Sequence, residues 1–294
     1  MGVKIICHGG VSSKSPRMQE KQKVVEHAAR VGMFALTQGR TALDAVVEAI
    51  TIMEDSPLCN AGTGSFIQMD GKVRMDAALM DQNLSVGAVI QISDVKNPIR
   101  VARTLMEKKV SSVLMGELAT SFAFNNGHKF YDPRTEDRIQ TWLSLWKQYR
   151  HMGDEALIYQ MQEHIKEDEM LGTVGAVALD RNGNLAAGTS TGGLKLDMPG
   201  RVGDVPLIGC GTYCNRNVGV SCSGTGEKII KMVLAKTIVD AVEYGKSFDE
   251  ALDIGIQKMG EVKGQAGFIS ISSNGEIGYR FNTEMIATSQ LEED

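Results

Sequence analysis

The glycines of this chain are crowded into one stretch, and that crowding limits what the stretch can fold into. The sequence has 32 glycines in 294 residues, about 11% against a usual ~7%. Thirteen of them lie between Gly172 and Gly226, whereas residues 1–171 hold only twelve. Glycine permits positive φ angles and close backbone approach. We therefore expect the region 172–226 to bring several backbone segments together around a small site.

Charge and composition exclude several classes of protein. Lys and Arg total 31 while Asp and Glu total 36, so the formal net charge is −5. This balance argues against a nucleic-acid binder, since phosphate recognition needs a basic surface. No apolar run reaches the ~18 residues of a membrane span, and the N-terminal segment does not fit a signal peptide. The five cysteines form no disulfide framework, which favours a reducing cytoplasm.

Hydrophobic periodicity predicts alternating helices and strands on both sides of a charged segment. Before that segment we expect strands at 3–7, on either side of Asp70-Gly71 and at 86–92, and helices at 18–38, 42–54 (after a capping box beginning at Thr41) and from 98 onward. After it we expect strands at 173–180, 185–191, 218–223, 268–272 and 277–281, and helices at 226–243 and 248–262.

The charged segment itself spans residues 135–171. It is rich in acidic, basic and amide side chains. It predicts a helix around Trp142–Tyr149, followed by an exposed linker over about 150–172. We place a boundary here, between residues 1–172 and 173–294.

The strand after the linker begins at Thr173 and turns back at Asn182-Gly183. A two-residue turn at Asn182-Gly183 would place Thr173 opposite Gly192. Thr191 would then lie at the same end of the hairpin, although a bulge would change which face it shares.

Thr173 directly follows a glycine, and cleavage of the bond between them would free its α-amine. An α-amine has a reference pKa of ~7.7–8.0. It can therefore act at neutral pH as the base for the hydroxyl of its own residue. The alternative that Thr173 is an ordinary β-branched strand residue stays open at this point.

Opposite charges stand three residues apart in the glycine-flanked segment 200–204. Arg201 could hold a substrate carboxylate in a bidentate manner, while Asp204 could accept from a substrate ammonium group. This pairing suits an amino-acid substrate. The competing interpretation is a surface salt bridge.

The segment 221–227 runs from a predicted strand into a predicted helix. Its glycines would expose backbone N–H groups, and Ser223 would add a hydroxyl donor. Together these groups could form an oxyanion hole for acyl transfer. A phosphate loop is the alternative, but the third glycine of the dinucleotide fingerprint is missing and no Gly-Lys-Ser/Thr occurs.

Four blocks of the sequence together resemble the plant-type asparaginases, also called isoaspartyl peptidases, a family of N-terminal-nucleophile hydrolases. The blocks are Gly172–Asp180, Thr189–Gly193, Gly200–Asp204 and Cys222–Glu227. Three further blocks in the first half support the resemblance: His8–Gly10, Pro57–Gly64 and Met75–Ala77. They follow the family's order over nearly the whole chain.

The resemblance implies an α+β fold, a four-layer αββα sandwich made as a precursor that cuts itself between Gly172 and Thr173. The α part would be 1–172, ending in the charged linker of about 150–172. The β part, 173–294, would begin at the nucleophile and share one domain with the α part. The family also implies a homodimer of such αβ units.

The resemblance assigns the catalytic groups by position. Thr173 matches the family's nucleophile, and Thr191 matches the threonine that supports it. Ser223 and Gly224 match the oxyanion-hole pair. The implied activity is acyl transfer through Thr173, cleaving L-asparagine to aspartate and ammonia and hydrolysing β-aspartyl peptides.

The substrate-binding groups are assigned in the same way. Arg201 and Asp204 match the clamp on the α-carboxylate and α-amine, Gly226 matches a residue at the substrate, and Asn60 matches an asparagine near the nucleophile. The family needs no cofactor for catalysis. It binds a structural sodium through main-chain carbonyls, here within about 52–63.

Three positions depart from the family's pattern. Ser223 stands where the family usually has threonine, so the hydroxyl remains without the methyl group that fixes its rotamer. Val11-Ser12-Ser13 follows His-Gly-Gly where Ala-Gly is usual, and Gln82 replaces a glycine after Met-Asp. The last two lie in the part thought to strain or position the precursor.

Other functions remain as alternatives. Within the superfamily the runner-up is a glycosylasparaginase. A non-catalytic descendant that keeps the amino-acid clamp and does not cut itself is the rival from another class. A nucleotide-binding protein comes third.

Overall fold

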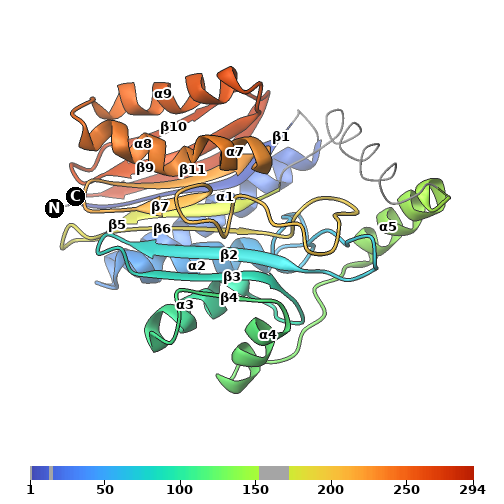
Figure 1. The fold of residues 1–294 in the computed structure, drawn as a ribbon. Helices are drawn as coiled ribbons and strands as arrows, with labels where there is room; N and C mark the ends of the chain where they lie inside the picture. The colour runs from blue at the N-terminus through green and yellow to red at the C-terminus, as the bar shows by residue number, and fades with distance from the viewer. Residues whose placement is uncertain (1, 13–15, 152–171) are drawn as a thin grey trace.

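The strands form two sheets that pack against each other (Figure 1). The computed structural model describes residues 2–12, 16–151 and 172–294. The seven-stranded sheet runs, in spatial order, β11 (Met285–Glu293), β1 (Val3–Ser12), β5 (Val174–Leu179), β6 (Leu185–Thr191), β2 (Met75–Asp81), β3 (Val86–Ile92) and β4 (Val113–Met115). The four-stranded sheet runs β10 (Ile277–Phe281), β9 (Ala266–Ser272), β8 (Val218–Gly224) and β7 (Thr212–Cys214). Strands β5 and β6 contact β8, and β1 contacts β9, so the sheets face each other.

Helices pack against both sheets (Figure 1). The described helices are α1 (Pro16–Thr37), α2 (Ala42–Glu54), α3 (Pro98–Lys108), α4 (Gly116–Asn125), α5 (Glu136–Tyr149), α7 (Gly226–Met232), α8 (Leu234–Glu243) and α9 (Phe248–Glu261). Helices α1, α2 and α3 contact the large sheet, whereas α8 and α9 contact the small one. The predicted α+β class is confirmed. No helix in the described ranges is long and apolar enough to cross a bilayer.

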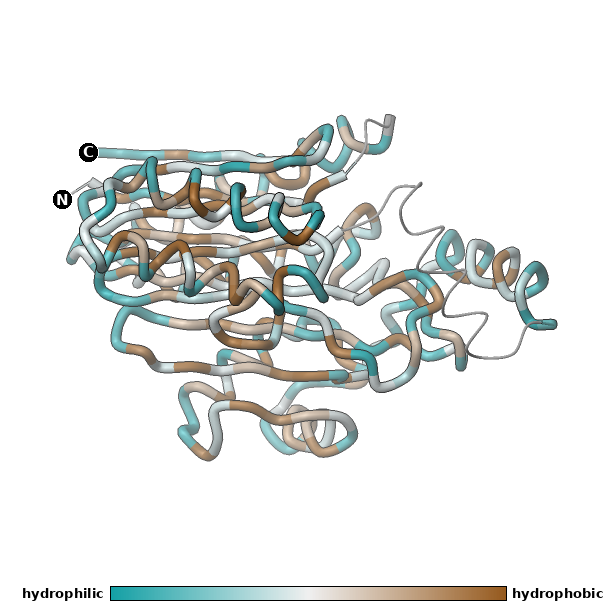
Figure 2. Tube along the Cα trace, turned by 45° about the horizontal axis from the view of Figure 1, so that its top comes forward, coloured by the Kyte–Doolittle hydropathy of each residue, from teal (hydrophilic) through white to brown (hydrophobic). Residues whose placement is uncertain are grey.

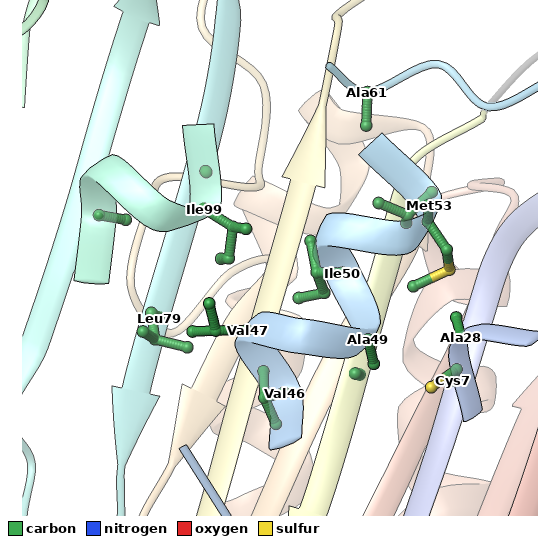
Figure 3. Close-up of a cluster of buried hydrophobic side chains, with 14 of the residues drawn as sticks. Cys7, Ala28, Val46, Val47, Ala49, Ile50, Met53, Ala61, Leu79 and Ile99 are labelled. Carbon is green, nitrogen blue, oxygen red and sulfur yellow. The ribbon is translucent and has the colours of Figure 1, made fainter. Parts of the chain in front are cut away.

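The predicted capping box starts α2 as expected. The side chain of Thr41 accepts from the N–H of Asp44, and the Asp44 carboxylate accepts from the N–H of Thr41. From this start Val46, Ile50 and Met53 recur every three or four residues, so they share one face of the helix. All three are fully buried against the large sheet (Figure 3). Burial of each such side chain is worth about 1.5–3 kcal/mol.

Strand alternation gives the large sheet a row that faces the helices and a row that faces the small sheet. In β5, Val174 and Ala176 pack on the helix side, whereas Val177 and Leu179 pack between the sheets. Because side chains alternate with period two, Thr173 belongs to the second row. Thr173 therefore lies at one end of the space between the sheets, and the apolar cluster fills the other.

Several expected elements differ from those observed. Strand β1 continues to Ser12 instead of opening into a loop after residue 7. The Asp70-Gly71 turn is present, but the segment before it is not a strand, and the strand after it, β2, begins only at Met75. Strands β4, β7 and β11 and helix α4 were not predicted. The expected charged linker falls outside the described residues, apart from 150, 151 and 172.

The predicted helix 226–243 is two helices. Val233 separates α7 from α8 with a φ of 45°, and the first turn of α8 bonds away from α7. The N–H groups of Ala235 and Lys236 donate to the carbonyls of Cys210 and Gly209. These bonds fix the start of α8 on the loop before β7, so the chain must turn at Val233. Figure 2 shows hydrophilic and hydrophobic residues interspersed along the helices that cover the sheets.

Candidate active site

Thr173 lies opposite Thr191, one residue away from the predicted partner. The ladder between β5 and β6 pairs Val174 with Ser190, so its next pair is Thr173 with Thr191, where the sequence predicted Gly192. This one-residue shift matters because it puts the two threonine side chains on the same face of the sheet.

The shift is caused by the turn. The N–H of Asp180 bonds to the carbonyl of Asn184 at 3.0 Å, which leaves three residues in the loop instead of two. The Asp180 side chain accepts from the N–H groups of Asn182 and Asn184 at 2.9 Å and 3.0 Å. Gly183 supplies the positive φ of 77° that such a turn needs. The aspartate side chain thus selects the register.

The two threonine hydroxyls are in contact. The Thr173 hydroxyl donates to Thr191 Oγ1 at 3.2 Å, and the same Thr191 oxygen accepts from the N–H of Gly193 at 3.2 Å. Both threonines are buried. Thr191 therefore orients the Thr173 hydroxyl and has its own oxygen fixed by the backbone.

Asn60 holds the backbone around the Gly172–Thr173 bond. Its N–H donates to the carbonyl oxygen of Gly172 at 3.2 Å, and its carbonyl accepts from the N–H of Gly192 at 2.8 Å. The Asn60 side chain donates to the carbonyl of Gly193 at 2.7 Å. A Cβ atom on Gly172 would lie 2.6 Å from the Cβ of Asn60. Only glycine fits at position 172, beside the carbonyl that would be attacked in self-cleavage.

Arg201, Asp204 and Gly226 meet at the start of α7. A Cβ atom on Gly226 would lie 3.0 Å from both the Arg201 guanidinium and Asp204 Oδ1. Asp204 is buried, and its Oδ2 has no hydrogen-bond partner within the described residues. An unpartnered buried carboxylate oxygen is costly unless a ligand satisfies it. The site therefore offers an acceptor suited to an ammonium group.

Acidic side chains that the sequence interpretation did not assign surround Arg201. Its guanidinium bonds to Glu227 at 2.8 Å and to Asp197 at 3.3 Å. Asp76 pairs with Thr191 across β2 and β6, and its electrostatic interaction with Arg201 links the two threonines to the charged cluster. Spacing offered one signal, since Asp197 stands four residues before Arg201. Asp76 belongs to the block Met75–Ala77, and the sequence assigned it no role.

Burial makes two of these carboxyls weak acids. It raises the pKa of Asp204 to about 7, because the attraction of Arg201 offsets the loss of hydration only in part. Burial likewise raises the pKa of Asp76 to about 7, against the hydrogen bond from the Gln91 N–H at 2.7 Å. A cationic ligand beside them would favour their ionised forms.

Ser223 has a hydroxyl whose proton is available for donation. Its Oγ accepts from the N–H of Val11 at 3.3 Å, so the Ser223 proton can point to another acceptor. Gly224 follows at the end of β8, where a Cβ atom would lie 2.3 Å from the carbonyl oxygen of Gln265. Val11 is one of the residues that depart from the resembled pattern, and here it orients the serine through its backbone alone.

Sequence comparison decides the family. The sequence model of the asparaginase family matches residues 1–294. This chain belongs to the asparaginase family.

Members of the asparaginase family from distant organisms resemble the chain over almost its full length. A plant-type L-asparaginase from Pyrococcus furiosus is 44% identical over 99% of this chain and 97% of its own length. An isoaspartyl peptidase from Escherichia coli is 38% identical over 97% of this chain and 91% of its own length. An isoaspartyl peptidase/L-asparaginase from Xenopus laevis is 38% identical, with 99% and 92% covered. The chain is a hydrolase of this asparaginase and isoaspartyl peptidase family.

Proposed function

We propose that the chain is a self-processing amidohydrolase that cleaves L-asparagine and β-aspartyl peptides through an acyl-enzyme on Thr173. The observation that carries the proposal is the contact between the Thr173 and Thr191 hydroxyls, beside a Gly172 carbonyl that accepts from the Asn60 N–H. The proposed fold is the αββα sandwich of N-terminal-nucleophile hydrolases. Its four layers would be helices α1–α3, the seven-stranded sheet, the four-stranded sheet, and helices α8 and α9.

Self-cleavage is the first of the two proposed reactions. Thr173 Oγ1 attacks the Gly172 carbonyl carbon, and the C–N bond to Thr173 breaks as the C–O bond forms. The hydroxyl proton moves to the departing nitrogen, which becomes the α-amine. The Asn60 N–H, 3.2 Å from the Gly172 oxygen, stabilises charge developing on that oxygen. Water then hydrolyses the ester, which separates residues 1–172 from 173–294.

The freed α-amine is the base of the second reaction. It takes the proton from Thr173 Oγ1, and the oxygen attacks the side-chain carbonyl of asparagine or of a β-aspartyl peptide. Ser223 and the N–H of Gly224 are assigned to the oxyanion. Ammonia or an amine leaves with one proton, and water releases aspartate and regenerates the hydroxyl. No cofactor takes part in these steps.

The clamp gives the proposed specificity. Arg201 binds the α-carboxylate of the substrate and Asp204 its α-ammonium group, with Gly226 leaving room between them. Glu227 and Asp197 hold the guanidinium in place. A substrate carboxylate would add to or replace the more exposed Glu227 contact. Nucleic acids lack this pairing of groups.

We also propose a structural sodium at the loop that carries Asn60. Gly62 and Gly64 have φ angles of 57° and 90°. Cβ atoms on them would lie 2.4 Å from the carbonyl oxygen of Glu54 and 2.7 Å from that of Pro57. These contacts keep the loop tight, and main-chain carbonyl oxygens are ligands that suit a hard cation. A higher melting temperature in sodium chloride than in choline chloride at equal ionic strength would support sodium binding within 52–63.

Two substrates test the proposed activity. Processed protein should release ammonia from L-asparagine and leucine from β-Asp-Leu, and Arg201→Met should weaken both activities through KM. The matched control is Arg280→Met, at a half-buried arginine that pairs with Asp249 and Asp253 away from the proposed site. An intact chain that binds aspartate without turnover would favour the non-catalytic descendant. Turnover of only N-glycosylated asparagine would favour the glycosylasparaginase.

A further inference from the structure

A second row of polar side chains lies directly beneath the proposed catalytic row. His8, Thr189, Thr212 and Ser221 are all fully buried. Thr189 stands two residues before Thr191 on β6, so it shares the same strand face roughly 7 Å deeper between the sheets. The same spacing relates Ser221 to the proposed oxyanion serine on β8. None of these four side chains has a part in the proposed mechanism.

The four side chains form one hydrogen-bonded chain that crosses from the large sheet to the small one. His8 Nε2 lies 3.0 Å from Ser221 Oγ, which lies 2.7 Å from Thr189 Oγ1. Thr212 Oγ1 donates to the same Thr189 oxygen at 2.6 Å. The Thr189 hydroxyl donates in turn to the carbonyl of Gly211 at 3.3 Å.

The tautomer of His8 sets the direction of the hydrogen bonds along these four side chains. Its Nδ1 accepts from the N–H of Gly10 at 3.2 Å, and burial lowers the pKa of the ring to about 3, against a hydrogen bond with the Thr173 backbone that raises it. A neutral ring with an accepting Nδ1 carries its one proton on Nε2. With the proton on Nε2, Ser221 Oγ accepts from His8 and donates to Thr189, and Thr189 donates to Gly211.

Gly175 leaves the space for this chain. It pairs with His8 on one side and with Thr189 on the other. A Cβ atom at position 175 would lie 2.0 Å from Ser221 Oγ and 2.5 Å from His8 Nε2. A glycine inside a buried strand costs about 0.5–1 kcal/mol of stability. Room for the hydroxyl chain accounts for its presence two residues after Thr173.

This hydrogen-bonded chain ends at Gly211, whose backbone contacts Asp204. The N–H of Gly211 donates to the carbonyl of Asp204 at 3.0 Å. A Cβ atom on Gly211 would lie 2.8 Å from Asp204 Oδ2, so the Gly211 backbone packs directly against the carboxylate. Thr189 bonds to both Gly211 and its neighbour Thr212. A shift of these bonds would therefore move Asp204.

We propose that the buried chain His8–Ser221–Thr189 positions the Asp204 carboxylate, and that it does so by fixing the Gly211–Thr212 backbone against the strands that carry the nucleophile. These three residues and Thr212 are positioning residues, since none of them contacts the substrate. The inference rests on the proposed role of Asp204 as the ammonium acceptor. It predicts that damage to the chain weakens substrate binding more than turnover.

The test compares Thr189→Val with Thr189→Ser and Ser270→Ala in processed protein. Valine keeps the shape of threonine but removes the hydroxyl, and serine restores the hydroxyl. Ser270 is an equally buried hydroxyl of the small sheet whose recorded bond is to Gly219, so its loss measures the general cost of a buried hydroxyl. Thr189→Val should raise the Kd for L-aspartate and the KM for asparagine on the order of 10-fold. The value of kcat should stay within about threefold, and Thr189→Ser should recover most of the affinity.

Two results would overturn the inference. One is an L-aspartate affinity of Thr189→Val equal to that of Ser270→Ala. The other is a nitrogen NMR spectrum in which His8 carries its proton on Nδ1. Loss of hydrolysis with intact aspartate binding in the unmodified protein would instead count against the proposed function alone. Absence of aspartate binding in that protein would contradict both.

Discussion

At the scale of single residues, missing side chains shape the site as much as those present. A Cβ atom on Gly172 would lie 2.6 Å from the Asn60 Cβ, and one on Gly192 would lie 2.4 Å from the Ser65 Cβ. These two glycines let the Asn60 loop approach both strands of the hairpin. The glycine count predicted such crowding between 172 and 226. It could not predict which backbone each glycine would meet, because that depends on the folding of a loop more than a hundred residues away.

The Ser223 hydroxyl should matter for turnover more than for binding. Ser223→Ala removes a donor that we assign to the oxyanion, and loss of such a donor typically lowers kcat by about 10²–10³-fold. Its KM should change little, and Ser223→Thr should keep most of the activity because it keeps the hydroxyl. Steady-state kinetics of ammonia release on processed protein measures this. An unchanged kcat would remove Ser223 from the oxyanion hole.

Asp204 should make substrate binding depend on pH. Its carboxyl must be ionised to accept from an ammonium group, and its pKa is raised to about 7 by burial. L-aspartate affinity should therefore fall as the pH drops below about 7, where the carboxyl becomes protonated. Asp204→Asn should weaken binding about 30-fold at pH 8, since hydrogen bonds to charged groups are worth ~2 kcal/mol, and should remove this part of the pH dependence.

Calorimetric titration between pH 5.5 and 8.5 measures the effect. Asp253→Asn is the matched control, because that carboxylate is exposed and bonds only to Arg280 among the interactions recorded for it. Equal pH profiles for Asp204→Asn and the unmodified protein would show that another group, such as Asp76, governs binding.

At the scale of elements, local signals predicted well and long-range bonds were missed. The capping box of Thr41 and Asp44 placed the start of α2 correctly because all of its bonds lie within one turn. The hairpin register was one residue off because the Asp180 side chain enlarges the turn. The break at Val233 depends on carbonyls of residues 209 and 210, which no helical periodicity reveals.

Val233 should be a site where glycine stabilises the protein. A β-branched residue with a φ of 45° carries roughly 1–2 kcal/mol of strain, more than the ~0.5–1 kcal/mol that the freedom of glycine costs. Val233→Gly should therefore raise the melting temperature by about 2 °C. Val113→Gly, an exposed valine in strand β4, should lower it. A lower melting temperature for Val233→Gly would contradict the strain argument.

At the scale of the whole molecule, the proposed cleavage site divides a sheet that neither part can complete. In the spatial order β11-β1-β5-β6-β2-β3-β4, strand β1 comes from before residue 172 but lies between β11 and β5, which come from after it. The termini meet in the same ladder, where Val3 pairs with Glu293. The sequence predicted most of these strands, yet it could not predict β11 closing the edge of β1.

The two proposed fragments should therefore stay together after cleavage. In native size-exclusion chromatography residues 1–172 and 173–294 should co-elute, and light scattering should give the mass of two αβ units if the homodimer forms. The fragments should separate only in denaturant, because separation exposes both faces of β5 and breaks its ladder with β1. Native separation of the fragments would contradict the shared sheet.

The charged cluster around Arg201 was only partly predictable from the sequence, because its members come from distant parts of the chain. Arg201 and Asp204 are three residues apart in the chain, so the sequence alone could suggest that they act together. Asp76 reaches the same cluster from β2 through its pairing with Thr191, which is a tertiary fact. Asp76 comes from before the proposed cleavage site and the other charged residues around Arg201 come from after it, so this cluster is assembled only in the complete fold.

Intact mass spectrometry of the purified protein tests the central proposal most directly. The account predicts two masses, those of residues 1–172 and 173–294, with threonine at the N-terminus of the second. It predicts one uncut mass for Thr173→Ala, which lacks the attacking hydroxyl. A cut at the same bond in Thr173→Ala, or a single uncut mass for the active unmodified protein, would contradict it.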